Sequence, residues 1–528
     1  MPRWTPPPRK KRPFVPTLRT ICASVLIASQ VLMPPLARAQ LLPGLGDGGE
    51  MTATAERHLG DQIARELYRD TDYIDDPVIA DYVQEIWQRL LAAARVRGEL
   101  TPELDERYAW VVMLGRDRNI NAFALPGGYL GLNLGLVAAV GSRDELATVL
   151  GHELSHVTQR HIARMMDKQS KQFPLMLAGL ILGMIAAGKS RGGGDAGQAM
   201  VMGSQAAFMQ NQLNFSRDME READRVGFGV MTQAGFAPQG AATMFEKLQY
   251  ASRLNDNGSF PYLRSHPLTT ERISDMQGRF QFRMDTVPPP VLLMDHAMVS
   301  SRARVLTRPG VDVLRQWVDA ASTGEFARST PAQQAGTLYA AALSAKQLRD
   351  HKAARALAQR LVERTADDAP AARQARWLQA EIELAAGGAG VAKAASLLDG
   401  KAKSRPEMLL AADVAVASRQ PAPMIPVLRD WVAANPRDAT AWRTLANLYG
   451  AQNDTLHAVR ADAESNVAIL DYPAARDRFK AAQELIRQSQ SGRPGSVPID
   501  HFEASIIDTR AREIEVLVKR QAEEPALR

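Results

Sequence analysis

The chain contains 528 residues, of which 45% are hydrophobic and 23% charged, and this excludes a disordered, fibrous or polytopic membrane protein. The net charge of +6 comes from residues 1–39, which hold seven basic residues and no acidic one, whereas the remaining 57 basic and 58 acidic residues nearly balance. The rest of the chain therefore lacks the electrostatic pattern of a nucleic-acid-binding protein.

The first 39 residues have the order of a secretory signal peptide. A basic, proline-rich stretch is followed by an uncharged apolar run at residues 21–33 and by the small-residue sequence Ala-Arg-Ala at residues 37–39. We expect cleavage after Ala39. An uncleaved membrane anchor is an alternative, but the apolar run is shorter than the ~20 residues of a spanning helix. Lipoprotein processing at Cys22 is a second and weaker alternative to cleavage after Ala39.

Cys22 is the only cysteine, so the mature chain would contain none. Disulfides and thiolate zinc sites are thereby excluded.

Residues 40–52 are glycine-rich and are expected to form a flexible lead-in. From Ala53 to about Gln281, amphipathic helical periodicity alternates with a short β-like stretch, which predicts a domain of helices with a small sheet over residues 53–287.

The β-like stretch is the glycine-rich, apolar segment Asn121–Leu132. It could present an edge strand against which an extended peptide pairs by β-augmentation. A simple buried strand is the alternative.

The sequence His152-Glu153-Leu154-Ser155-His156 carries the clearest chemical signal. Positions i and i+4 of an α-helix share a face, so both imidazoles can bind one zinc ion while Glu153 lies beside them. Glu153 is then placed to take a proton from the attacking water and return it to the leaving amine.

The helix around this motif is well specified by the sequence. Ser142 and Glu145 have the spacing of a capping box. Burial is predicted by an apolar stripe made of Leu146, Val149, Leu150 and Val157. Two solvated histidines would be the alternative interpretation of the motif, although they interrupt an apolar face. His161, one turn further, falls off this geometry and is expected to be structural or at the surface.

A catalytic zinc needs a third protein ligand and an open position. Without cysteines that ligand must be His, Asp or Glu, and the acidic segment 216–224 is the candidate. Glu220 and Asp224 share a helix face, whereas Glu222 points elsewhere. We expect Glu220 to bind the metal and Asp224 to accept a hydrogen bond from a ligand imidazole. The alternative is an ordinary charged face on which the acids pair with Arg217, Arg221 and Arg225.

One segment departs from a plain soluble enzyme. Phe173–Gly188 is uncharged and strongly apolar, and basic residues and glycines follow it. It is short for a membrane span, so we expect a plug over the active site or a peripheral contact with a membrane interface. A core helix is the alternative.

The run Val287-Pro288-Pro289-Pro290 marks a domain boundary. Residues 300–528 are alanine- and arginine-rich with helical periodicity, which predicts a second, all-α domain that folds alone. A weak repeat of about 34 residues, the period of tetratricopeptide helix pairs, is clearest from Asn435 to Ala458, and about four units are expected. An alanine-rich bundle without repeat geometry is the alternative, and either would be a partner-binding module.

The chain resembles peptidase family M48 in both motifs and in three further segments. Residues 121–129 are similar to the strand and turn before the zinc helix of that family. Residues 214–217 lead into the acidic pair as its second motif does, and Ser265-His266-Pro267 resembles a histidine segment of its secreted bacterial members. The order of signal peptide, peptidase domain and helical repeats is also similar to these members.

The resemblance implies a fold that is mainly α with a small β-sheet, a zincin-like α+β peptidase domain at residues 53–287. An all-α tetratricopeptide-like helical-repeat domain follows at residues 300–528.

The resemblance also assigns roles to site residues. It implies His152, His156 and Glu220 as ligands of one zinc ion per chain and Glu153 as the general base. Asp224 would be the acid that can act as a proton donor. A further implication is that His266 can take the fourth zinc position and hold the enzyme inactive until a substrate or partner arrives.

These observations predict a zinc endopeptidase, and the resemblance places it in the periplasm. It implies unfolded or misassembled outer-membrane β-barrel proteins as substrates, docking of the repeat domain onto the barrel-assembly machinery, and a chaperone role beside proteolysis. The rival is a non-catalytic chaperone or scaffold with a structural zinc site. Such a site would have four protein ligands and no use for Glu153.

Overall fold

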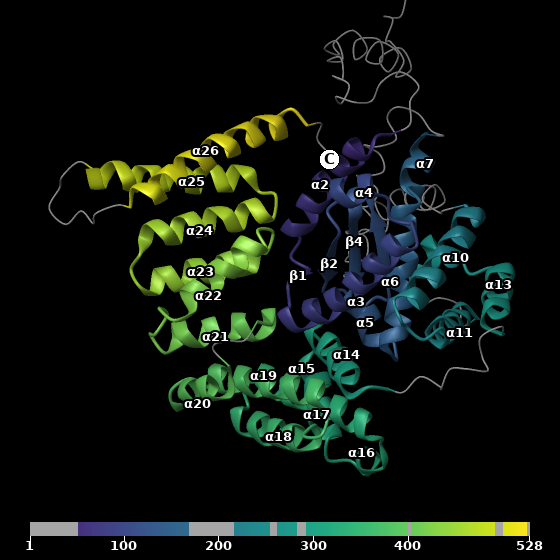
Figure 1. The fold of residues 1–528 in the computed structure, drawn as a ribbon. Coiled ribbons are helices and arrows are strands. Elements are labelled where there is room, and N and C mark those ends of the chain that lie inside the picture. Colours follow the sequence, from purple (N-terminus) through teal and green to yellow (C-terminus); the bar gives the residue numbers. More distant parts are fainter. Residues whose placement is uncertain are drawn as a thin grey trace, which may run out of the picture. The chain divides into compact units, whose positions relative to one another are not determined.

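The computed structural model describes residues 51–167, 216–253, 261–281, 292–399, 403–490 and 500–524 (Figure 1). The first part of the chain contains α2 (Ala53–Arg69), β1 (Tyr73–Ile74), α3 (Pro77–Val96), α4 (Pro102–Arg107), β2 (Val111–Gly115), β3 (Ala122–Leu125), β4 (Tyr129–Asn133), α5 (Leu134–Ala139), α6 (Arg143–Thr158), α7 (His161–Asp167), α10 (Arg217–Gln233), α11 (Gln239–Arg253), α12 (Tyr262–Ser265) and α13 (Thr270–Gln281).

The second part is helical throughout its described residues. It contains α14 (Met294–Leu306), α15 (Val311–Ala320), α16 (Gly324–Arg328), α17 (Pro331–Gln347), α18 (His351–Arg364), α19 (Ala369–Ala386), α20 (Ala389–Leu397), α21 (Arg405–Ala417), α22 (Met424–Ala434), α23 (Ala439–Ala451), α24 (Thr455–Ala468), α25 (Tyr472–Gln490) and α26 (His501–Ala522).

Several segments singled out in the sequence lie outside the described residues. These are the signal peptide at 1–39, most of the lead-in at 40–52, the apolar segment Phe173–Gly188, residues 214–215 and the proline run at 287–290. Among the helices that are described, none combines the length and the apolar character needed to cross a membrane.

The small sheet has the strand order β1-β2-β4-β3. β2 pairs parallel with β4, whereas β1 and β3 are antiparallel to their neighbours. Ala124 of β3 lies opposite Leu130, and the Asn133 amide donates to the Asn121 carbonyl. The main-chain groups of Ala122 and Ala124 therefore point away from β4. Within the described sheet, β3 is an edge strand.

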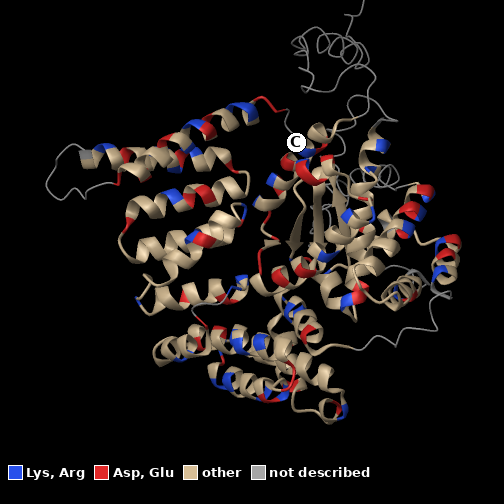
Figure 2. Ribbon diagram, in the orientation of Figure 1, with Lys and Arg blue, Asp and Glu red and all other residues tan. Residues whose placement is uncertain are grey.

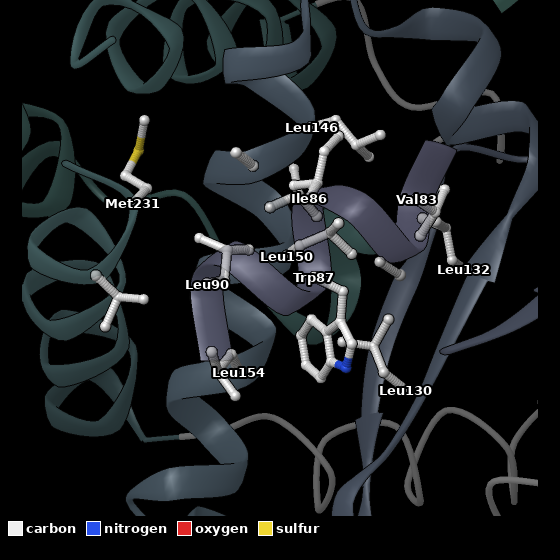
Figure 3. Packing of buried hydrophobic residues seen from close by; sticks show 14 of the residues in the cluster. Val83, Ile86, Trp87, Leu90, Leu130, Leu132, Leu146, Leu150, Leu154 and Met231 are labelled. Carbon is white, nitrogen blue, oxygen red and sulfur yellow. The ribbon is translucent and has the colours of Figure 1, made fainter. Parts of the chain in front are cut away.

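The main hydrophobic core of the first part of the chain lies where α3 and α6 pack on one another and on the sheet. Trp87 and Leu90 of α3 lie close to Leu130 of β4 and to Leu150 and Leu154 of α6 (Figure 3), and each is at most 1% exposed. Burial of each side chain of this size contributes about 1.5–3 kcal/mol to folding. This packing fixes α6, which carries the histidine motif, against the sheet.

The second part of the chain consists largely of recurring helix pairs. From α17 onward, the first helices of successive pairs begin at residues 331, 369, 405, 439 and 472, so the starts are 33–38 residues apart. Four of the turns within these pairs contain residues with positive φ, namely Arg349, Gly387 with Gly388, Arg419 and Asn453. The predicted helical-repeat domain is confirmed, and a fifth pair, α25 and α26, follows the four expected ones.

Helix α14 takes part in two hydrophobic cores. Val299 and Ala303 belong to the core of the first part of the chain, which contains Trp87. Met298 and Val305 belong to the core formed with α17, α18 and α19. The helix thus joins the two parts of the chain, although the sequence placed its first residues between the domains.

A buried arginine on the same helix strengthens this junction. Arg302 donates to both carboxylate oxygens of Asp76, the N-cap of α3, at 2.7 Å each. It also lies 3.0 Å from Glu381 of α19. Because a guanidinium with two carboxylate partners keeps its charge satisfied, Arg302 can be buried at the contact between the two parts.

Candidate metal centre

The histidine motif lies on α6, as the sequence predicts. The Ser142 hydroxyl accepts from the Glu145 amide at 3.1 Å and caps the helix start. The predicted capping box also requires the Glu145 side chain to accept from the Ser142 amide, and this part of the prediction is wrong. Glu145 instead accepts from the Gly141 amide, one residue before the cap, at 2.6 Å. Lys247 also donates to this carboxylate, at 2.6 Å. Glu145 is thereby drawn away from the Ser142 amide.

Both motif histidines are buried. His152 is 5% exposed and His156 is fully buried, and the predicted apolar stripe is buried with them. The alternative of two solvated histidines is therefore wrong. The side chains of these two residues meet on one face of α6, where their Nε2 atoms lie 3.0 Å apart.

Helix α10 brings the acidic pair to the histidines. Ser216 caps this helix by accepting from the Met219 amide. Glu220 is 2% exposed and Asp224 7% exposed, so the alternative of a solvated charged face is wrong. The Oδ1 atom of Asp224 lies 3.0 Å from Nδ1 of His152.

Two glycines allow α6 and α10 to come this close. A Cβ atom added to Gly227 would lie 2.9 Å from the backbone of Gly151 and from the amide nitrogen of His152. Backbone atoms of two packed helices cannot move aside as a flexible side chain can. The glycine contact therefore sets the distance between the histidines of α6 and the carboxylates of α10.

Substitution of Gly227 by Ala is expected to push α10 away from α6. We expect a loss of about 1–3 kcal/mol in the free energy of unfolding, because overpacking outweighs the better helix propensity of Ala. Zinc affinity should fall as well, because Glu220 moves with α10. Gly450→Ala on α23, where an added Cβ meets nothing within 4 Å, is the matched control. Thermal unfolding and zinc titration measure both effects, and unchanged zinc affinity in Gly227→Ala would contradict the spacing argument.

Four buried residues bring ligand atoms to one point. The ligand atoms of His152, His156, Glu220 and His266 all lie within 4.8 Å of one another. Oxygens of Glu220 lie 3.5 Å from Nε2 of His152 and 3.4 Å from Nε2 of His156. Nδ1 of His266 lies 3.3 Å from Nε2 of His152. Bonds of ~2.0–2.1 Å to a tetrahedral zinc separate its ligand atoms by about 3.3 Å, so the set fits this ion.

An orphaned carboxylate oxygen also fits a cation. Oε1 of Glu153 is buried and accepts no hydrogen bond from any described residue. A buried carboxylate oxygen without a donor is costly unless it binds a cation or a water. The chemistry of the donor set, two or three imidazoles and one carboxylate, is that of a zinc site.

Glu153 lies between β3 and the ligand cluster. It is fully buried, and its Oε2 accepts from the Ala124 amide of β3 at 2.9 Å. Its Oε1 lies 3.5 Å from Nε2 of His266. His266 thus stands between Glu153 and the other ligands, with Nδ1 toward the ligand cluster and Nε2 toward the carboxylate.

Arg272 of α13 is a site residue that the sequence analysis did not single out. It donates to both oxygens of Asp224, at 2.7 and 2.8 Å, and its Nη1 lies 2.8 Å from Glu220. Nη1 also donates to the carbonyl of Pro267, next to His266. One buried guanidinium therefore connects the acidic pair to the segment that carries His266.

His161 and Glu222 lie behind the ligand cluster. Of the two expectations for His161, structural or at the surface, the structural one agrees with its position, because it is fully buried and its Nδ1 lies 2.9 Å from Nδ1 of His156. Glu222 does point away from the ligand cluster, as predicted, but it lies 3.0 Å from Nε2 of His161. Both residues therefore contact the site indirectly.

Burial sets the protonation of the site in the absence of metal. Removal from water raises the pKa of the Glu153 carboxyl and lowers the pKa of His156 well below its ordinary value. Glu220 and Asp224 are also withdrawn from water, yet the histidine and arginine side chains around them lower the pKa of both carboxyls. A neutral His156 and an ionised Glu220 are the forms that bind a metal.

Comparison with known proteins agrees with this site. Residues 79–280 match the model of peptidase family M48. The beta-barrel assembly-enhancing protease of Yersinia pestis is 30% identical over 441 residues, which are 81% of this chain and 85% of that protein. The protein of that name from Escherichia coli K12 is 28% identical over 481 residues, 89% of this chain and 92% of that protein.

A Vibrio cholerae protein that is provisionally given the same name is 34% identical over 309 residues. This alignment covers 57% of the present chain and 59% of that protein. The expected metallopeptidase family is thus confirmed, and the buried cluster can hold the one zinc ion on which the family depends. The chain belongs to peptidase family M48.

Proposed function

We propose that the chain is a periplasmic zinc endopeptidase that cleaves unfolded or misassembled outer-membrane β-barrel proteins. The observation that carries the proposal is the convergence of His152, His156 and Glu220 beside the buried carboxylate of Glu153. The names of the relatives from Yersinia and Escherichia support the substrate class. The signal-peptide pattern of residues 1–39 supports export.

The residues around the site supply the parts of peptide hydrolysis. When bound, zinc provides Lewis-acid activation of the scissile carbonyl and of the attacking water. Glu153 takes the proton of that water and delivers it to the leaving amine. Asp224 holds His152 through Nδ1 and so fixes which ring nitrogen faces the metal.

The edge strand β3 offers a place for the substrate backbone. The main-chain groups of Ala122 and Ala124 point away from β4, and the Ala124 amide bonds Glu153. An extended peptide that pairs with this edge would pass directly beside the general base. Unfolded segments meet this requirement, because their backbone hydrogen-bonding groups are free to pair.

The recurring helix pairs support a partner-binding role for residues 300–528. Repeat arrays stack their apolar faces on one another and leave an extended surface for other proteins. Figure 2 shows basic and acidic residues interspersed over the described helices. This mixture suits protein partners, with the barrel-assembly machinery as the proposed one, rather than a polyanion such as nucleic acid.

The proposed function is tested on the purified chain from residue 40 onward. Zinc content is measured, and cleavage of an unfolded outer-membrane β-barrel protein is compared with cleavage of an unfolded water-soluble protein. We expect one zinc ion per chain, chelator-sensitive cleavage and faster cleavage of the β-barrel protein. Absence of zinc would contradict the enzyme, and equal cleavage of both proteins would contradict the substrate class.

A non-catalytic scaffold with a structural zinc is the second candidate. The observation that favours it is that His266 completes a set of four protein ligands, as in closed structural sites. The position of Glu153 favours the enzyme, because its Oε1 faces His266 and would face the fourth ligand position once His266 moved away. We therefore propose that His266 is a regulatory ligand that blocks the resting enzyme.

Substitution of His266 by Ala is expected to raise basal cleavage of unfolded protein several-fold or to cause self-digestion. Bound zinc should stay, because three protein ligands remain. Cleavage assays and metal analysis measure the two effects, with His501→Ala, an exposed histidine on α26, as the control. A simultaneous loss of zinc and activity in His266→Ala would make His266 an obligatory ligand, as the scaffold predicts.

A further inference from the structure

A sharp turn at the end of α6 brings a third histidine back onto the zinc motif. α6 ends at Thr158, and Arg160 adopts a left-handed backbone conformation with φ of 52°. Such a conformation is strained for a residue with a side chain. An ion pair of 2.9 Å with the buried carboxylate of Glu56 holds Arg160 in place. The next helix, α7, therefore begins at His161 in a new direction.

The turn creates a chain of buried polar contacts behind the metal ligand His156. Nδ1 of His161 lies 2.9 Å from Nδ1 of His156, and Nε2 of His161 lies 3.0 Å from Oε2 of Glu222. Arg164 donates to the same oxygen of Glu222 at 2.8 Å. Both imidazoles are fully buried. The order Glu222, His161, His156 thus connects α10 to the ligand cluster by a second route.

The positions of the protons along this chain follow from the geometry. His156 turns Nε2 toward His152 and Glu220, so as a metal ligand it carries its proton on Nδ1. That N–H points at Nδ1 of His161, which must then accept. His161 consequently carries its own proton on Nε2 and donates it to Glu222, whose charge is balanced by Arg164.

We propose that His161 and Glu222 are positioning residues for the zinc ligand His156. They fix its ring orientation and its tautomer, as Asp224 does directly for His152. The proposal rests on the proposed zinc site but not on the substrate class. Loss of such an outer partner typically lowers metal affinity by about 10–100-fold, so a measurable effect on zinc binding is expected.

The test compares two substitutions of His161 in the full mature chain. His161→Leu fills the buried space but cannot accept a hydrogen bond, whereas the amide oxygen of His161→Asn can accept from Nδ1 of His156. Zinc affinity is measured by competition with a chelator of known affinity. The visible absorption spectrum of the Co²⁺-substituted chain reports the arrangement of the ligands.

We expect His161→Leu to bind zinc about 10–100-fold more weakly, with an altered Co²⁺ spectrum, and His161→Asn to recover most of the affinity. His296→Leu is the matched control, because His296 is also buried but bonds Tyr82 and the Val140 carbonyl instead. This control should lose stability without any change in zinc affinity.

Glu222→Gln tests the other end of this series of polar contacts with little change in side-chain shape. If His161→Leu does not fold, this variant decides whether the proposal holds. We expect zinc affinity to fall by about 10-fold, with Asp218→Asn, an exposed carboxylate on the same helix, as the unaffected control. Wild-type affinity in both Glu222→Gln and His161→Leu would overturn the proposal. Equal losses in His161→Leu and His161→Asn would overturn the acceptor role of His161.

Discussion

Replacement of Glu153 by Gln is expected to abolish peptide hydrolysis while zinc stays bound. The amide cannot take a proton from water, and general base catalysis typically contributes about 10²–10⁴-fold to the rate. The fold should persist, because the amide oxygen can still accept from the Ala124 amide as the carboxylate does. Cleavage of an unfolded substrate and metal analysis are measured on the same sample.

Glu145→Gln is the matched control for this substitution. Glu145 is a buried glutamate on the same helix, but it bonds Gly141 and Lys247 at the helix start rather than the zinc site. It should cleave substrate at the wild-type rate. Full proteolysis by Glu153→Gln would remove Glu153 from the role of general base, whereas a wild-type chain that binds zinc but cleaves nothing would favour the scaffold with a structural zinc.

Replacement of Glu220 by Gln is expected to strip zinc from the protein and to remove cleavage with it. The substitution replaces a charged metal ligand by a neutral amide. The loss of zinc affinity should therefore be larger than the loss of about 10–100-fold that follows removal of a hydrogen-bond partner of a ligand. The pair of Arg272 with Asp224 remains, which limits the damage to the fold. Zinc retained after dialysis against a weak chelator is the measurement.

Asp218→Asn on the same helix is the control, because Asp218 is exposed and forms an ion pair with the nearby Arg221 rather than with the site. It should keep one zinc ion per chain. A Glu220→Gln protein that retains full zinc would remove Glu220 from the ligand set and would require another carboxylate in its place.

The residues on α6 and α10 could be predicted because helical spacing alone places them. His152 and His156, like Glu220 and Asp224, lie four residues apart, and the structure brings both pairs to one point. The meeting of the two helices had a signal as well, since Gly151 adjoins the first motif histidine and Gly227 interrupts α10. Glycine inside a helix is unfavourable unless another backbone comes close.

Other site residues had no such signal. Arg272 reaches Asp224 from a helix that begins 46 residues further along the chain, and nothing local marks this contact. His161 was placed by extending α6 past its actual end, whereas the left-handed conformation of Arg160 turns the chain. The number of helix pairs was underestimated because their spacing varies and the last pair lacks the clear repeat pattern of Asn435–Ala458.

Helix α14 gives the peptidase domain a role in the repeat array. A solenoid exposes an apolar face at each end and needs a cap there to remain soluble. Here the first helix pair is covered by α14, whose opposite face is already embedded in the core of the first part of the chain through Val299 and Ala303. The peptidase domain is thus the N-terminal cap of the solenoid. A fragment that starts at residue 300 divides α14 and would leave the array uncapped, so fraying could spread from both of its ends rather than from the C-terminal one alone.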